Sequence, residues 1–250
     1  MSNIRSLYRD TVNFCYHQAS NIILMAILIS FLTVLINTII LPSYYNEQMQ
    51  FIFETNSPKY LEQNVFIHIV QKMSSEQLRL LLYFAGLHFF ITLLGNTLML
   101  GGIINLITMV SSGKRGNILL ALEKSLLQFP RLLILTFIKN LFNELGLIIL
   151  IFPGIVLTLL LSLSPIVMIN EKTSILDAMR ISTYMILKFQ KLVIPILILW
   201  LLGKIFLLIF SYFVTHLFVI TISIIILNMI DYLINAVITI YLYRFYMLYR

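Results

Sequence analysis

Charged residues are scarce in this sequence. They account for 11% of its 250 residues, whereas hydrophobic residues account for 60%, and an ordinary soluble domain carries charge on about a quarter of its residues. A soluble fold of this length could not remove so much apolar surface from water, but a bilayer solvates helices that are apolar on every face. The low charge content therefore excludes a soluble globular protein and predicts an integral membrane protein.

The sequence also lacks the residue patterns from which most catalytic and metal sites are built. Its single cysteine, Cys15, excludes an intramolecular disulfide and a cysteine-based metal cluster. The four histidines have no metal-ligand spacing, and there is no phosphate-binding glycine loop, H-E-x-x-H motif or nucleophile elbow. We therefore expect no catalytic residue, no cofactor, no metal and no enzymatic activity.

Long apolar runs dominate the chain instead. A helix needs about 20 mostly apolar residues to cross the hydrocarbon core of a membrane. The runs predict an all-α transmembrane bundle that occupies the whole chain as one domain, with six spans near residues 21–41, 80–110, 132–151, 154–170, 192–214 and 217–243. The first run is longer than the apolar part of a signal peptide, so we expect it to be retained.

The turn between the third and fourth spans has two candidates. The apolar stretch 132–170 is too long for one straight span and long enough for two. Pro153 and Gly154 form the preferred turn, because proline interrupts a helix and glycine accepts unusual backbone angles. The rival turn is the segment 143–146, which would draw Lys124 and Arg131 into the third span at a high energetic cost.

The distribution of basic residues predicts the orientation. Six spans place twelve of the 17 basic residues on one side of the membrane. These residues are Arg5, Arg9, Lys114, Arg115, Lys124, Arg131, Lys172, Arg180, Lys188, Lys191, Arg244 and Arg250. Three others lie in the loop 42–79 on the opposite side. Because basic connectors stay in the cytoplasm, we expect both termini to be cytoplasmic. Because the basic residues are confined to short connectors, they also argue against nucleic acid as a partner. The partners that we expect are membrane lipids, with an unidentified membrane protein as a further possibility.

Three segments outside the spans have the pattern of helix starts or short amphipathic helices. In the outer loop, Ser74 and Ser75 precede Glu76 and Gln77 and indicate a helix start. The segment 173–188 opens with capping residues and alternates apolar with charged residues at helical spacing, and the segment 117–129 repeats this pattern. We expect both to lie at the cytoplasmic membrane surface; the alternative is that they extend neighbouring spans. Together with the N-terminal segment they suggest three loosely matching repeats, each a surface helix followed by a hairpin.

Four ionisable residues fall inside the predicted spans, where an unpaired charge is costly. They are Lys139 and Glu144 in the third span, Lys204 in the fifth and Asp231 in the sixth. Lys204 lies 12 residues beyond Leu192, and Asp231 lies 13 residues before Arg244. Both therefore reach a depth of about 18–20 Å from the cytoplasmic boundary. Since the fifth and sixth spans form a hairpin, we predict that Lys204 and Asp231 pair.

Small and aromatic residues in the spans predict how the helices pack. We expect Gly95, Gly101 and Gly102 in the second span to allow close helix approach, and Asn96 to form a hydrogen bond across helices. Tyrosines 241, 243, 246 and 249 indicate an interfacial aromatic belt at the end of the sixth span. We interpret Trp200 as a packing residue.

A set of short motifs runs nearly from end to end of the chain. It comprises residues 8–11, 73–77, 95–96, 101–102, 153–155, 200–204 and 240–247. On these motifs the whole chain resembles the YciC family of bacterial inner-membrane proteins. The resemblance implies a multi-pass protein of the inner membrane and carries no assigned activity. More distantly, Pro153 and Gly154 followed by Ala178 and Ser182 are similar to the membrane domain of some glycerophosphodiester phosphodiesterases, whose catalytic domain has no counterpart in this sequence.

Two functions remain open at this stage. The first is a non-enzymatic structural or interaction component of the membrane, in which the charge cluster fixes helix packing. The second is a small transporter or channel, in which Lys139, Glu144, Lys204 and Asp231 line a path for a proton, an ion or a substrate. A dry, packed cluster favours the first function, and a cavity lined by these residues favours the second.

Overall fold

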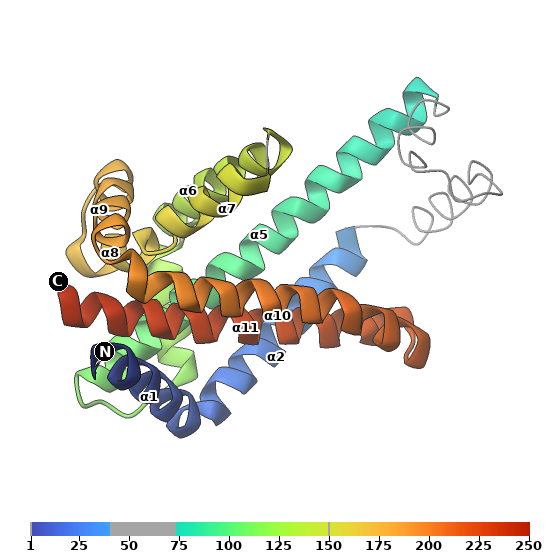
Figure 1. Ribbon diagram of the computed structural model, residues 1–250. Helices are drawn as coiled ribbons and strands as arrows, with labels where there is room; N and C mark the ends of the chain where they lie inside the picture. The colour runs from blue at the N-terminus through green and yellow to red at the C-terminus, as the bar shows by residue number, and fades with distance from the viewer. Residues whose placement is uncertain (1, 41–73, 150) are drawn as a thin grey trace. The chain divides into compact units, whose positions relative to one another are not determined.

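A computed structural model describes residues 2–40, 74–149 and 151–250. In these ranges every regular element is a helix (Figure 1), which confirms the predicted all-α class. The chain divides into two compact units, one formed by Met1–Phe31 and Leu93–Arg250 and the other by Leu32–Thr92. The first unit contains the predicted charge cluster and most of the buried core.

Apart from the interval between α2 and α5, which contains the undescribed residues 41–73, the helices follow one another with short connections. They are α1 (Ser2–His17), α2 (Ala19–Ile40), α5 (Ser75–Ser111), α6 (Ile118–Ile149), α7 (Ile151–Leu160), α8 (Ser164–Glu171), α9 (Ile175–Lys188), α10 (Gln190–Leu217) and α11 (Ile220–Tyr249). Within the described residues, five segments are long and apolar enough to cross a membrane: Ala19–Ile40, Ser75–Ser111, Gly154–Glu171, Gln190–Leu217 and Thr221–Tyr249. α6 contains most of the predicted third span, 132–151, whose end lies outside the fully described residues. The chain is therefore polytopic, and the count of six stays a prediction.

α6 and α7 form an antiparallel hairpin (Figure 1). The glycines of the two helices meet where the hairpin is narrowest, since a methyl group on Gly146 would lie 2.7 Å from Cα of Gly154. Farther along, the hydroxyl of Thr158 donates to the side-chain oxygen of Asn143. α6 is helical through the segment 143–146, so the rival turn is wrong. Pro153 and Gly154 belong to the first turn of α7, which begins at Ile151, so the preferred turn is also misplaced by a few residues. A proline in the first turn leaves no helical hydrogen bond unmade.

The predicted fourth span, 154–170, is not one continuous helix. α7 ends at Leu160 and α8 begins at Ser164. Pro165 has no backbone N–H to continue the helix, and the hydroxyl of Ser164 donates to the carbonyl of Leu161 at 2.6 Å. Ser182 of α9 donates to the carbonyl of Leu160 at 2.6 Å and so satisfies the end of α7. The break is thus held by contacts within the span and from the next helix.

The two predicted surface helices have different outcomes. α9 is a separate helix, because Lys172 has a left-handed backbone (φ 54°) before it and Phe189 ends it. Ser174 caps it as predicted by accepting from the backbone N–H of Asp177 at 3.2 Å. The segment 117–129 is instead the beginning of α6, so the prediction of a separate helix there is wrong. A buried stripe that includes Ala121, Ser125, Leu132 and Thr136 continues past Pro130 and keeps the helix in one piece.

The described part of the outer loop confirms the predicted helix start. Ser74 accepts from the backbone N–H of Gln77 at 3.2 Å, and the side chain of Gln77 accepts from the backbone N–H of Ser74 at 2.9 Å. This reciprocal capping box begins α5. Residues 75–79 of the predicted loop 42–79 therefore belong to α5, and residues 42–73 lie outside the described residues.

The tyrosines near the end of α11 are buried rather than exposed in a belt. Tyr241, Tyr243 and Tyr246 have exposed fractions of 0%, 5% and 8%. Their hydroxyls donate to the carbonyl of Leu192, to Asn170 and to the carboxylate of Glu171. The interpretation as an interfacial belt is therefore wrong for these three residues, because helix packing provides their polar partners.

Candidate functional site

The α10–α11 hairpin forms the predicted ion pair between Lys204 and Asp231. The second oxygen of Asp231 accepts from the amide of Asn235 at 3.1 Å, and the oxygen of Asn235 accepts from Nε1 of Trp200 at 3.2 Å. Nζ of Lys204 also lies 5.6 Å from the ring centroid of Trp200. The four side chains thus form a closed network between two helices, in which both charges are neutralised.

This network forms one wall of a cavity of about 240 Å³ in the first unit. The cavity lies among α5, α6, α7, α10 and α11, and its polar lining is concentrated on α6 and α11. The polar lining residues are Asn96, Thr136, Lys139, Asn140, Asn143, Thr158, Ser162, Trp200, Lys204, Asp231, Tyr232, Asn235 and Thr239. Met99, Ile103, Val193, Ile196 and Leu197 are among the apolar lining residues. The cavity therefore has both charged and apolar walls within the depth of the predicted spans.

Lys139 lies on α6, on a different hairpin from the ion pair. It lines the cavity, and its side chain has no hydrogen bond or ion pair with another described residue. The structure therefore brings Lys139, Lys204 and Asp231 around one space. Glu144 belongs to α6 as well, but its side chain lies outside the described residues. Three of the four members of the predicted charge cluster are thus placed at the cavity.

The sequence analysis missed most of the uncharged lining. Trp200 was interpreted as packing, but its indole N–H donates to Asn235. A signal for these residues was present, because several polar residues repeat at a spacing of four in otherwise apolar runs. The pairs are Thr136 with Asn140, Lys139 with Asn143, Thr158 with Ser162, Trp200 with Lys204, and Asp231 with Asn235. Residues four apart lie on one face of a helix, so each pair predicts a polar stripe.

The predicted packing glycines of α5 lie beside the cavity. Gly95 is buried, and Asn96 lines the cavity. The side chain of Asn96 makes no hydrogen bond with another described residue, so the expected bond across helices is not found among them. A methyl group on Gly101 would collide with Oγ of Ser125 on α6, and one on Gly102 would lie 2.7 Å from Sδ of Met25 on α2. The absence of side chains at Gly101 and Gly102 therefore lets α6, and α2 around Met25, pack closely against α5.

Acidic, histidine and cysteine side chains do not gather anywhere in the described ranges. No group of three or more of them is placed to hold a metal ion there. The chemistry that the cavity offers is therefore that of an ammonium group, a neutral ion pair, amides and hydroxyls.

Comparisons with known proteins give the family. The model of an uncharacterised protein family, UPF0259, matches residues 1–248. A UPF0259 membrane protein of Yersinia pestis (strain Pestoides F) is 37% identical over 248 residues, which cover 98% of this chain and 95% of the relative. A UPF0259 membrane protein of Yersinia pseudotuberculosis serotype IB (strain PB1/+) has the same identity and coverage. No solved structure matches the chain. YciC is a UPF0259 member, so the resemblance drawn from the sequence is confirmed, and the chain belongs to the uncharacterised UPF0259 family of membrane proteins.

Proposed function

We propose that the protein is a small transporter that passes a polar solute through the cavity between the α6–α7 and α10–α11 hairpins. The observation that carries this proposal is the placement of Lys139, Lys204 and Asp231 around a space of about 240 Å³. A purely structural charge cluster has no need of such a space, because a packed ion pair excludes voids. A solute path requires one, together with polar groups that replace the hydration of the solute.

The interrupted fourth span supports the same function. Ser162 lies in the break between α7 and α8 and lines the cavity, and Thr158 lines it one turn earlier. Ser162 is near the middle of the candidate span Gly154–Glu171. In many transporters, discontinuous helices form the solute site near the midplane of the bilayer. Here the carbonyls of Leu160 and Leu161 are bonded within the protein, and the break brings the side chain of Ser162 to the cavity.

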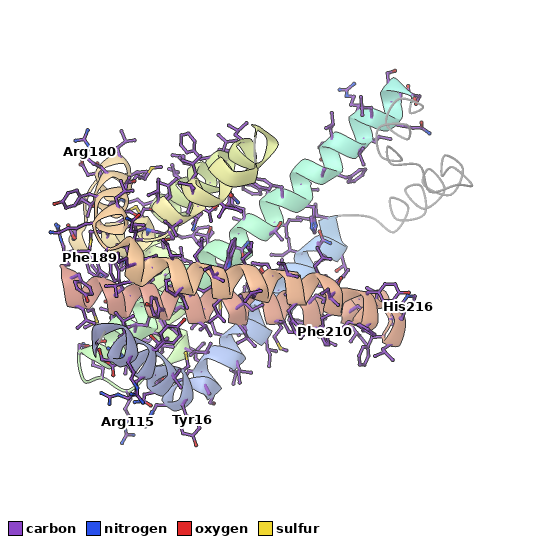
Figure 2. The ribbon with its side chains drawn as sticks, viewed as in Figure 1. Tyr16, Arg115, Arg180, Phe189, Phe210 and His216 are labelled. Atoms are coloured by element: carbon purple, nitrogen blue, oxygen red, sulfur yellow. The ribbon has the colours of Figure 1, made fainter. Side chains whose placement is uncertain are left out.

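The orientation that we propose is inner-membrane insertion with both termini in the cytoplasm. Figure 2 shows Arg115 and Arg180 at one end of the α10–α11 hairpin and His216 at the opposite end, and Figure 1 marks both chain termini at the end of Arg115 and Arg180. The basic connectors therefore share one end of this unit, as the positive-inside rule requires of a cytoplasmic face. We further propose a non-enzymatic protein whose partners are membrane lipids and a transported solute, without nucleic acid.

Cysteine accessibility tests transport against a purely structural role. On a Cys15→Ser background, Asn140→Cys and Ser162→Cys place thiols on the cavity lining, and Leu141→Cys and Phe142→Cys place them on the exposed apolar face of the same α6. A membrane-impermeant thiosulfonate reagent is applied to right-side-out and to inverted vesicles. We expect both cavity thiols to react from both sides and both control thiols to react from neither, because lipid does not admit the reagent. Cavity thiols that react no faster than the controls, or from one side alone, would overturn the proposal.

The second candidate is the structural or interaction component, and one observation favours it. The network of Lys204, Asp231, Asn235 and Trp200 leaves neither charge without a partner, which is how a packing device is built. This observation concerns only the α10–α11 hairpin. It does not account for Lys139 or for the space in front of it, so the transporter is the better supported function.

A further inference from the structure

We infer that the cavity selects small monovalent carboxylates, with Lys139 as the group that binds the negative charge. This inference rests on the proposed function and adds the class of solute. It follows from the charges around the cavity, from the hydrogen-bond donors beside Lys139, and from the size of the space.

The charged lining has an excess of one positive charge among the described residues. Lys204 and Asp231 cancel each other in their ion pair, and the remaining ionised side chain on the lining is Lys139. An ammonium group at this depth is costly without a counter-ion. A monovalent anion in the cavity restores neutrality, whereas a monovalent cation doubles the uncompensated charge. The cavity therefore discriminates by the sign of the solute.

The groups next to Lys139 on α6 add hydrogen-bond donors. The amide oxygen of Asn143 accepts from the hydroxyl of Thr158, so its NH₂ group remains as the donor on that side chain. Lys139 and Asn143 are four residues apart on the same helix face, and both line the cavity. An ammonium and an amide N–H that face one space match the two oxygens of a carboxylate.

The volume and the apolar lining limit the solute further. A space of about 240 Å³ corresponds to about eight water molecules at their share of liquid volume, ~30 Å³ each. Apolar side chains of α5 and α10, among them Met99, Ile103 and Ile196, line the rest of the cavity. A short aliphatic chain fits such a wall, whereas a phosphate monoester carries close to two negative charges at neutral pH and would leave the site net negative.

Glu144 is the acid of α6 closest in sequence to Lys139, and its side chain lies outside the described residues. The inference requires that the anion preference survives Glu144→Gln. A preference for anions that appears only after this substitution would contradict it.

The single tryptophan of the chain provides a direct measurement. Trp200 lines the cavity and is the sole tryptophan, so its fluorescence reports on what enters. The full-length protein in lipid nanodiscs is titrated with iodide, with caesium and with neutral acrylamide. We expect iodide to quench Trp200 several-fold more strongly than caesium does, and the two ions to become equal in Lys139→Gln. Lys139→Arg should retain the difference between iodide and caesium. Lys191→Gln should retain it too, because Lys191 is an exposed lysine of α10, the helix of Trp200, and lies outside the cavity.

Competition identifies the class of anion. Sodium pyruvate, a carboxylate too acidic to cross lipid in its neutral form, should protect Trp200 from iodide in the wild-type protein and in Lys191→Gln, and should lose this effect in Lys139→Gln. Inorganic phosphate and choline chloride at equal concentration should protect less. Phosphate that protects better than pyruvate would overturn the carboxylate assignment.

The two proposals fail in different ways. If acrylamide, iodide and caesium all leave Trp200 unquenched, the cavity does not admit solutes and the proposed transport function fails. If acrylamide quenches but iodide is no better than caesium, the cavity is accessible and only the anion inference is wrong. Variants are compared at matched thermal stability, so a misfolded Lys139→Gln is replaced by Lys139→Met.

Discussion

At the scale of single residues, the Lys204–Asp231 pair decides the stability of the α10–α11 hairpin. Lys204→Met or Asp231→Leu leaves one charge without its partner; because the two side chains are 31% and 27% exposed, the cost lies below the ~3–5 kcal/mol of a fully buried pair. We expect each single variant to lower the amount of folded protein in the membrane. The double variant removes both charges and should recover much of this loss.

The measurement is the abundance and detergent melting temperature of the two single variants and the double variant. Recovery in the double variant supports direct pairing. A double variant as depleted as the sum of the two singles would show that the pair does not contribute as a unit. Transport by the double variant is a separate readout, because among the described lining residues Lys139, and not this pair, supplies the net charge.

Cys15 gives a second prediction at this scale. It lies in α1, outside the candidate spans, and burial raises the pKa of its thiol above the ordinary value. Thiolate is the reactive form, and a raised pKa means that less thiolate is present at neutral pH. Labelling of Cys15 by a maleimide should therefore be slow at pH 7 and should still be rising at pH 9. A rate that levels off below pH 8 would contradict this direction.

At the scale of helices, close contact between glycines holds the α6–α7 hairpin together. Because Cα of Gly154 would lie 2.7 Å from a methyl group on Gly146, Gly146→Ala must push two backbones apart, at a cost of about 1–3 kcal/mol. Gly86 of α5 is the matched control, since a methyl group there meets nothing within 4 Å. In a helix, Gly86→Ala should be neutral or stabilising by up to about 1 kcal/mol. Equal melting temperatures for the two variants would contradict the close crossing.

Most helices could be predicted from the sequence because the bilayer imposes a simple rule on length and polarity. The same rule, together with equal depths, was enough to pair Lys204 with Asp231. The break at residues 161–163 could not be predicted in this way, because it depends partly on Ser182, which reaches the carbonyl of Leu160 from another helix. The continuity of α6 past Pro130 likewise depends on tertiary contacts, such as that of Ser125 with Gly101 on α5.

The cavity, too, depends on tertiary contacts that could not be predicted from the sequence. The sequence identified Lys139 as an intramembrane charge, but nothing local distinguishes a charge that faces a cavity from one that faces a partner. Only the arrangement of α6 and α7 against α5, α10 and α11 creates the space. The polar residues at a spacing of four were visible in the sequence and would have predicted most of its walls. Their helical stripes are a stronger signal than the isolated charges.

At the scale of the whole molecule, the order of the helices suggests a unit that occurs three times. Each unit has a surface helix, or in one copy an N-terminal extension of the next helix, followed by a helical hairpin. The first copy is α1, α2 and α5, the second is α6 with α7 and α8, and the third is α9, α10 and α11. The order agrees with the three loosely matching repeats suggested by the sequence, although the second copy has no separate surface helix. Because each copy crosses the membrane twice in this scheme, each begins and ends on the same side. The scheme therefore fixes the side of every connector from the side of any one of them.

The side itself follows from the basic residues and gives the last prediction. Twelve of the 17 basic residues lie in the termini and connectors that the repeats place together. Figure 2 shows Arg115 and Arg180 at the end of the first unit where Figure 1 marks both chain termini. Single cysteines at Ser6, Asn117, Thr173 and Tyr249 on a Cys15→Ser background should be shielded from an impermeant maleimide in intact cells and labelled in inverted vesicles. Phe218→Cys, in the turn between α10 and α11, should behave in the opposite way. An odd number of spans would place the two termini on opposite sides of the membrane. Labelling of Tyr249→Cys but not Ser6→Cys from outside the cell would therefore contradict the six-span topology. Labelling of both from outside would reverse the orientation and leave the span count intact.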